Sequence, residues 1–352
     1  MIFYEYAHGG DIYDENGHAD ENTVDFSANI NPLGMPEGAL AAAKNSIARA
    51  NIYPDSNCRL LCAKLSAFEN VDKSDIFCSN GASDILFRLV FAARPKRILV
   101  TAPSFADYER AGRAAGAEVI YYTHKKENDF GLEGDIVDLI RETSPDIVFV
   151  CNPNNPTGNL TDLALLQEMA EACKLLVVDE CFLDFVSDPH RYSAKILVGK
   201  YKNTVVLKAF TKIFAMPGLR LGYAICTSRD LIGRMKLCGP DWAVSNTAQE
   251  AGIAALENGH GYMADSREYV KKQREYIVGE LKRMGFTVYP AHANFVFFHS
   301  PKAVLKDLKG IKIRDCSNFK GLGPGHYRAA VLTEEKNKLL IEAIEAIEAL
   351  CK

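Results

Sequence analysis

The stretch that decides the fold is residues 207–223, which read LKAFTKIFAMPGLRLGY. Lys212 follows an apolar run, and Arg220 stands eight positions later, after a Pro-Gly turn. A lone pair of this kind would ordinarily be two surface cations beside a turn. Lys212, however, has Phe210 and Phe214 as near neighbours, and desolvation by such side chains disfavours the charged amine and makes it a better nucleophile. The stretch therefore predicts a reactive lysine just after a strand.

Short apolar runs and helical patterns alternate on both sides of this lysine. Runs rich in Val and Ile, apolar on consecutive positions, are typical of strands buried on both faces. Their alternation with helices predicts an α/β fold, with a mostly parallel central sheet between helices. The predicted strands are Arg97–Thr101, Glu118–Tyr122, Asp146–Cys151, Leu175–Asp179, Thr204–Leu207 and Leu221–Cys226, and the predicted helices are Ala82–Ala92, Tyr108–Ala115, Gly134–Glu142 and Thr161–Cys173.

The last third of the chain has a different character. A charged, amphipathic segment, Asp265–Met284, predicts a long helix, and Thr333 is a suitable N-cap for a closing helix. We therefore expect a large domain over residues 38–245 and a smaller α+β domain built from both chain ends, residues 1–37 and 246–352. The predicted strands of the smaller domain are Phe286–Tyr289, Ala293–His299 and Tyr327–Val331.

Composition excludes several classes of partner. The 352 residues include 41 Lys plus Arg and 45 Asp plus Glu, for a formal charge of −4, and no long basic run suggests nucleic acid or an anionic membrane. The ten cysteines form no Cys-x-x-Cys pair or zinc-like spacing, so we expect no metal site and a reducing compartment. The N-terminus resembles no secretion signal and no stretch could span a bilayer, which favours the cytoplasm and a small-molecule partner.

Three further segments place polar residues beside predicted strands and helices. They are Cys151–Gly158 (CNPNNPTG), Val177–Phe182 (VVDECF) and Ser79–Asp84 (SNGASD). Each has an ordinary interpretation, as turn residues, a structural carboxylate and a helix start that binds nothing. Free N–H groups at a helix start also suit a phosphate, and ligands of parallel sheets bind at the carboxyl ends of the strands.

Taken together and in order, these segments resemble the fold-type I pyridoxal-phosphate enzymes of the aspartate aminotransferase superfamily. The resemblance covers nearly the whole chain. It implies that Lys212 holds pyridoxal 5'-phosphate and later moves protons, and that Asp179 pairs with the ring nitrogen. It also implies that Asn155 donates to the ring 3' oxygen and that Tyr108 lies against the ring face.

The same resemblance implies a place for the cofactor phosphate and for a second subunit. Tyr53 matches a tyrosine that reaches the cofactor phosphate of the partner subunit, so a homodimer is expected. Two positions depart from the usual pattern: Ala209 replaces a hydroxyl residue that binds the phosphate, and Phe182 replaces a tyrosine that bonds the 3' oxygen. These departures concern tuning rather than the class of chemistry. The residues expected around the phosphate are Gly81, Ala82, Thr211 and Arg220.

Within the superfamily, the chain is most similar to the L-threonine O-phosphate decarboxylases of corrinoid (cobalamin) biosynthesis and next to the histidinol-phosphate aminotransferases. The segments His8–Gly10 and Asp25–Gly34 (DFSANINPLG) resemble the decarboxylase pattern, as does Phe182. The aminotransferases more usually have an acidic residue where this chain has Ile30. Without the rest of the pattern, His8 would be a surface histidine and the asparagines near it would only shape a turn.

The resemblance implies decarboxylation of L-threonine O-phosphate to (R)-1-aminopropan-2-yl phosphate. The alternatives are a histidinol-phosphate or related aminotransferase and, more remotely, a cofactor-binding protein without turnover. Arg328 matches an arginine that forks onto the substrate carboxylate, a geometry that lysine cannot copy. Which cation holds the carboxylate and which the phosphate stays open. The expected substrate-binding residues are His8, Asn31, Asn155, Arg314 and Arg328.

Overall fold

A seven-stranded sheet forms the centre of the part of the chain that this computed structural model describes, residues 8–20, 22–300, 305 and 308–350. The strand order is β2-β8-β7-β6-β5-β3-β4, and β8 alone among these runs antiparallel to its neighbours. The mostly parallel sheet is thus confirmed. Its strands are β2 (Ile76–Ser79), β3 (Arg97–Ala102), β4 (Glu118–Thr123), β5 (Ile147–Cys151), β6 (Leu176–Asp179), β7 (Thr204–Ala209) and β8 (Gly222–Ile225).

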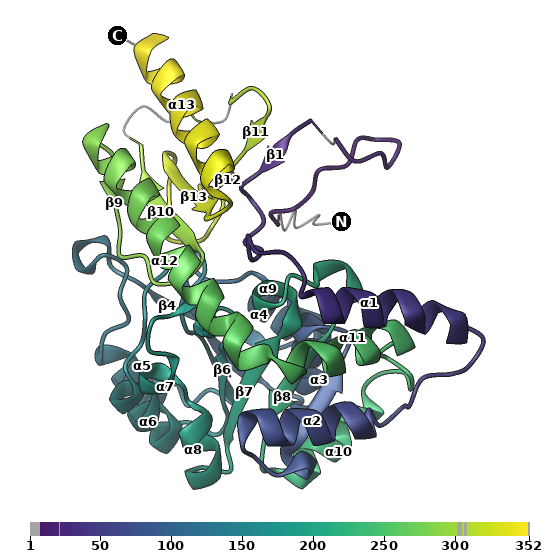
Figure 1. Ribbon diagram of the computed structural model, residues 1–352. Helices are drawn as coiled ribbons and strands as arrows, with labels where there is room; N and C mark the ends of the chain where they lie inside the picture. The colour runs from purple at the N-terminus through teal and green to yellow at the C-terminus, as the bar shows by residue number, and fades with distance from the viewer. Residues whose placement is uncertain (1–7, 21, 301–304, 306–307, 351–352) are drawn as a thin grey trace.

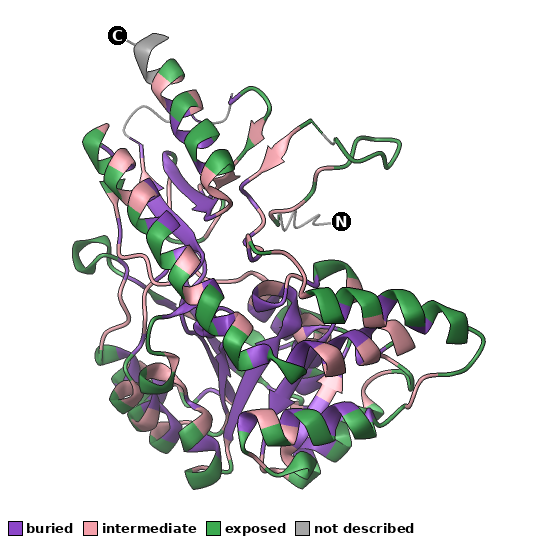
Figure 2. Cartoon of the chain, viewed as in Figure 1, coloured by how far each residue is buried: buried purple, intermediate pink, exposed green. Residues whose placement is uncertain are grey.

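Alternate residues of the central strands enter two separate cores, one on each face of the sheet. On β6, Leu176 and Val178 belong to one core and Val177 to the other. Because both faces are covered, every residue of β5, β6 and β7 is buried, and Figure 2 shows these strands in the buried colour. This is why the strands appear in the sequence as unbroken apolar runs.

Helices form the layers on both faces (Figure 1). One core takes side chains from α3, α4 and α10, and the other from α2, α5, α6, α8, α11 and α12. The helices of this part are α1 (Glu37–Ser46), α2 (Arg59–Glu69), α3 (Ala82–Ala93), α4 (Asp107–Ala114), α5 (Asp135–Thr143), α6 (Leu163–Ala172), α7 (Pro189–Tyr192), α8 (Lys195–Lys200), α9 (Phe210–Ile213), α10 (Arg229–Leu237) and α11 (Asn246–Glu257).

A smaller antiparallel sheet, in the order β12-β13-β10-β9, packs beside the two longest helices, α12 and α13, as Figure 1 shows. Beside it, β1 and β11 form a two-stranded parallel pair. Helix α11, which follows the expected domain border at 245, packs against α1 and α2. The elements are β1 (Val24–Asp25), α12 (Gly259–Arg283), β9 (Thr287–Val288), β10 (Phe295–His299), β11 (Ile311–Lys312), β12 (Arg314–Asp315), β13 (His326–Ala330) and α13 (Glu334–Leu350).

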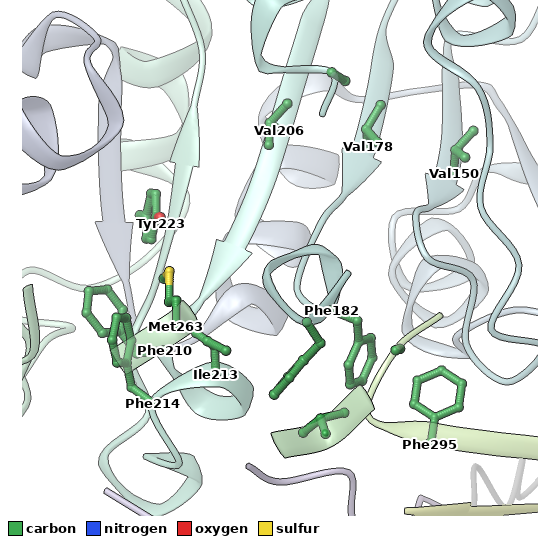
Figure 3. Packing of buried hydrophobic residues seen from close by; sticks show 14 of the residues in the cluster. Val150, Val178, Phe182, Val206, Phe210, Ile213, Phe214, Tyr223, Met263 and Phe295 are labelled. Carbon is green, nitrogen blue, oxygen red and sulfur yellow. The ribbon is translucent and has the colours of Figure 1, made fainter. Parts of the chain in front are cut away.

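Aromatic side chains join the two sheets where β6 ends and β10 begins. Phe182 and Phe295 are both buried, and their ring centroids lie 5.2 Å apart at an interplanar angle of 81°. Figure 3 shows both rings in the same cluster as Phe210 and Ile213, which belong to the lysine-bearing α9. The predicted reactive lysine therefore lies where the two sheets meet. In the part of the chain that the structure describes, the helices lack the combination of length and hydrophobicity that a membrane span requires.

Candidate active site

A cavity of about 620 Å³ lies at the carboxyl ends of the central strands, between the two sheets. Loops after β5, β6 and β7 form one wall, β12 and β13 another, and the start of the described chain a third. The structure brings together most of the residues that the sequence proposes. Those that line the cavity are His8, Ala82, Asn155, Asp179, Thr211, Lys212, Arg220, Arg314 and Arg328.

Lys212 lies on α9, the single helical turn that follows β7. Burial, with the guanidinium of Arg328 nearby, lowers the pKa of Lys212 to about 8. Its Nζ lies 5.8 Å from the ring centroid of Phe182, an apolar neighbour that cannot compensate a charge by hydrogen bonding. A substantial fraction of this amine is therefore neutral near physiological pH, as a nucleophile or a proton carrier requires.

Asp179, the last residue of β6, is buried and hydrogen-bonded on both oxygens. Its Oδ2 accepts from the hydroxyl of Tyr108 at 2.7 Å, and its Oδ1 accepts from the amide of Cys181 at 3.0 Å. Burial and the nearby carboxylate raise the pKa of Tyr108 well above its usual value, so the hydroxyl remains a donor. The Tyr108 ring also stacks on Phe149, with centroids 5.2 Å apart and planes 5° apart. The carboxylate is thus held in one orientation.

At the start of α3, the backbone around Gly81 closely approaches the segment from Arg220 to Gly222. Gly81 has φ +87°, and a Cβ there would come within 2.8 Å of the Arg220 guanidinium. A Cβ on Gly222 would come within 2.5 Å of the amide nitrogen of Ala82. Only glycine allows this approach, which brings helix N–H groups and a guanidinium to the same place. Such a place suits a phosphate.

Arg328, on β13, is buried in the cavity wall. It donates to the Asn155 side-chain oxygen and, at 2.6 Å, to the carbonyl of Ser27, while its buried Nε has no hydrogen-bond partner among the described residues. Burial lowers the pKa of Arg328 to about 10, which still leaves it charged at neutral pH. The opposite residue on β12 is Arg314. Two like charges facing each other across strands destabilise a sheet unless an anion lies between or beside them.

Arg314 lines the same wall as Arg328, and His8 lines the wall formed by the start of the described chain. Arg314 donates to the Asn318 side-chain oxygen at 2.9 Å and lies 5.0 Å from the Phe319 ring centroid. The Nε2 of His8 lies 3.5 Å from a carboxylate oxygen of Asp107. Both side chains are therefore held by neighbours that also line the cavity.

Four expected residues do not line the cavity: Gly81, Tyr108, Asn31 and Tyr53. Gly81 lies against the Arg220 guanidinium, and Tyr108 is buried between Asp179 and Phe149, so its contact with the cofactor ring stays a prediction.

Asn31 donates to the carbonyl of Ile213 and to the hydroxyl of Ser266, both at 2.7 Å, so its amide supports the backbone beside Lys212 and does not line the cavity. Tyr53 is 77% exposed and packs against Trp242, with ring centroids 4.7 Å apart and planes tilted by 31°. Its role toward a partner subunit stays a prediction.

The sequence interpretation missed Asn29. This residue lines the cavity, and its buried Oδ1 has no hydrogen-bond partner among the residues that the structure describes. Asn29 and Asn31 stand two positions apart in one turn. The sequence pattern therefore indicates that this segment belongs to the site, but it does not indicate which of the two amides faces the cavity.

The set of donors fits pyridoxal phosphate. The cofactor aldehyde needs an amine with a lowered pKa, which Lys212 provides. The ring nitrogen needs an oriented carboxylate, and the phosphate needs a cationic pocket with room beside glycines. The fold and the cavity define a pyridoxal-phosphate-dependent enzyme.

The chain belongs to the aminotransferase class I and II family, whose sequence profile matches residues 21–344. It is 31% identical to the threonine-phosphate decarboxylase of Salmonella typhimurium, over 99% of this chain and 98% of that protein. It is 32% identical to the histidinol-phosphate aminotransferase of Symbiobacterium thermophilum, over 92% of this chain and 90% of that one. The crystal structure of the histidinol-phosphate aminotransferase from Clostridium acetobutylicum superposes with a TM-score of 0.83 at 30% identity, covering 92% and 98% of the two chains. The expected fold and cofactor are thereby confirmed.

Proposed function

We propose that this enzyme decarboxylates L-threonine O-phosphate to (R)-1-aminopropan-2-yl phosphate, acting as a homodimer in the cytoplasm. The observation that carries the choice of reaction is that the His8-Gly9 segment, which resembles the decarboxylases, forms part of the cavity wall. Gly9 packs so tightly on Ser27 that a Cβ would lie 2.0 Å from the Ser27 carbonyl oxygen. The decarboxylase relative matches 99% of the chain, which includes this segment.

The charges of the cavity support a substrate with two anionic groups. Arg314 and Arg328 face each other across β12 and β13, and His8 lies in the wall contributed by the start of the chain. L-threonine O-phosphate bears a carboxylate and a phosphate, which together offset this concentration of positive charge. Histidinol phosphate bears only the phosphate.

Pyridoxal phosphate supplies a ring that accepts the electrons of the substrate Cα bond standing perpendicular to it. Arg328 and Arg314 choose that bond by holding the carboxylate and phosphate in fixed directions. Asp179, oriented by Tyr108, would pair with the ring nitrogen, and Asn155 would offer its amide nitrogen to the ring 3' oxygen, because its own oxygen accepts from Arg328. The Nζ of Lys212 then supplies the proton that replaces the departing carbon dioxide at Cα. Phe182, which packs against Phe295, gives this side of the cavity an apolar wall.

The test is incubation of the holoenzyme with L-threonine O-phosphate in the absence of any oxo acid. We expect carbon dioxide and 1-aminopropan-2-yl phosphate in equal amounts. The second candidate, transamination of histidinol phosphate, is favoured by the aminotransferase relatives. Conversion of histidinol phosphate to an oxo product that requires 2-oxoglutarate, together with no carbon dioxide from L-threonine O-phosphate, would establish it and reject the decarboxylase.

The proposed homodimer rests on exposed aromatic residues near the expected intersubunit tyrosine. Tyr53 and Trp242 pack against each other, and Trp242 is 49% exposed. Sedimentation of the holoenzyme should give twice the mass of the 38.9 kDa chain. Replacing Tyr53 by alanine should weaken cofactor retention in the dimer. A monomer with full activity would reject the role of this tyrosine.

A further inference from the structure

The residues between β12 and β13, 316–325, form a loop that crosses from the small sheet to the central one. Gly321, near its middle, has φ +86°, and a Cβ there would lie 3.2 Å from the Thr123 methyl and 3.5 Å from the Ala102 carbonyl oxygen. Thr123 and Ala102 end β4 and β3. The loop is therefore held against the carboxyl ends of two central strands.

Apolar side chains fix the loop from its other side. Phe319 and Leu322 pack against the buried cluster of Phe130, Phe297 and Cys316. The Arg314 guanidinium also lies over the ring of Phe319, 5.0 Å from the ring centroid. Because Phe319 and Gly321 both contact neighbouring elements, the residue between them has a defined position over the cavity.

That residue is Lys320, which lines the cavity and belongs to none of the roles assigned above. Its Nζ lies 3.7 Å from the ring centroid of Tyr121, which also lines the cavity. No carboxylate among the described residues forms an ion pair with this ammonium. A contact with an aromatic face leaves the three N–H donors of the ammonium group largely available.

The carboxylates nearby are engaged by other groups. Glu109 accepts from the Nε of Arg113 at 2.7 Å, and Arg113 also donates to the Tyr121 hydroxyl at 3.2 Å. Asp107 lies close to His8. Tyr121, which Lys320 contacts, is thus hydrogen-bonded to Arg113, and Arg113 is already paired with Glu109. The positive charge of Lys320 therefore remains available to a ligand.

We propose that Lys320 is a specificity-determining residue, which binds the phosphate group of the substrate at the outer end of the cavity, next to Arg314. This inference rests on the proposed function, since it requires a phosphorylated amine as substrate. The loop contacts at Phe319 and Gly321 hold the ammonium in place before the substrate arrives, so little ordering is needed when the phosphate binds.

The experiment measures binding of two amines that differ only in a phosphate, O-phosphoethanolamine and ethanolamine, to the holoenzyme by titration calorimetry. We expect Lys320→Met to raise the Kd of O-phosphoethanolamine about tenfold, the loss of one charge-assisted hydrogen bond. The Kd of ethanolamine should not change. Lys320→Arg should restore most of the affinity.

Lys200 offers a matched control, because it lies over the ring of Tyr201 at 4.9 Å and does not line the cavity. Lys200→Met should leave both affinities unchanged. Equal affinities of Lys320→Met and the unmodified enzyme for O-phosphoethanolamine would overturn the proposal, as would an equal loss for both amines. Since neither amine has a carboxylate, this result is independent of decarboxylation, and a failure to release carbon dioxide from L-threonine O-phosphate would reject the proposed function alone.

Discussion

The hydroxyl of Tyr108 donates to a carboxylate oxygen of Asp179 over 2.7 Å, and both side chains are buried. The sequence resemblance assigns Tyr108 to the face of the cofactor ring, and the structure adds this bond to the residue expected at the ring nitrogen. The orienting bond is part of the structure, whereas contact of Tyr108 with the cofactor ring stays a prediction, since the side chain is buried and does not line the cavity.

Removing this hydroxyl tests the orienting bond. Tyr108→Phe keeps the ring but loses a hydrogen bond to a charged group, about 1.5–3 kcal/mol. We expect kcat to fall at least tenfold while the enzyme still binds pyridoxal phosphate, as judged by steady-state kinetics and visible absorbance. The exposed Tyr13 serves as control, and Tyr13→Phe should be silent. An unchanged kcat in Tyr108→Phe would mean that the bond does not support Asp179 during turnover.

The lowered pKa of Lys212, about 8 instead of 10.5, predicts a pH dependence of cofactor capture. The neutral amine is the nucleophile, so the rate at which the cofactor-free protein takes up pyridoxal phosphate should rise with pH and level off above about 8. Stopped-flow absorbance between pH 6.5 and 10 measures this rate. A rate that keeps rising toward pH 10 would contradict the lowered pKa. Lys212→Ala should capture no cofactor covalently and show no turnover.

Arg220 is expected to hold the cofactor phosphate beside the start of α3. Arg220→Ala removes the guanidinium that lies against Gly81 and should raise the Kd for pyridoxal phosphate. Excess cofactor should then restore most of the rate. If saturating pyridoxal phosphate restores nothing, Arg220 acts on the reaction and not on cofactor retention.

Arg328 is the cation with the most demanding geometry. Its bonds to Asn155 and to the Ser27 carbonyl leave a planar donor group facing the cavity, which the single ammonium of lysine cannot reproduce. We expect Arg328→Lys to lower kcat/KM about 100-fold, or about 2.7 kcal/mol. The exposed Arg283 provides the comparison, since Arg283→Lys should have no effect on kinetics. Equal kinetics for both variants would refute bidentate binding.

A buried ion cluster that includes Lys208 of β7 predicts a stability effect. Glu69 is almost fully buried and pairs with Lys208 at 3.0 Å and Lys195 at 2.8 Å. Burial opposes ionisation, but these lysines lower the pKa of Glu69 from 4.5 to about 2. The folded-state pKa is the lower one, so this stabilisation is present above pH 4.5 and is lost as the pH falls toward 2.

Glu69→Ala should therefore lower the free energy of unfolding at pH 7 by about 3–5 kcal/mol, because it leaves Lys208 buried without one partner. Urea denaturation measures the difference. The exposed Glu257 is the control, and Glu257→Ala should change stability by less than about 0.5 kcal/mol. A small effect of Glu69→Ala would mean that water or Asp184 compensates the charge of Lys208.

The central strands could be predicted from the sequence because burial on both faces requires apolar residues at consecutive positions. The predicted Arg97–Thr101 and Leu175–Asp179 differ from β3 and β6 by one residue each. β2 was missed because it directly follows the polar segment Lys73–Asp75. α1, α2, α10 and α11 were also missed, and two-residue strands such as β12 carry no pattern long enough to be recognised.

Site residues that follow strands in sequence were predictable from their order along the chain. Relationships between distant segments were not. The register that opposes Arg314 to Arg328 depends on how β12 pairs with β13, and the choice between Asn29 and Asn31 depends on which side chain turns toward the cavity. The position of Lys320 depends on a loop that packs against another sheet.

Trp242 is the single tryptophan of the chain, and it packs against Tyr53. Indole emission from this protein therefore originates at one location, beside the residue expected to cross between subunits. A dilution series followed at that wavelength would report on association directly, with no dye attached and no signal from the rest of the polypeptide.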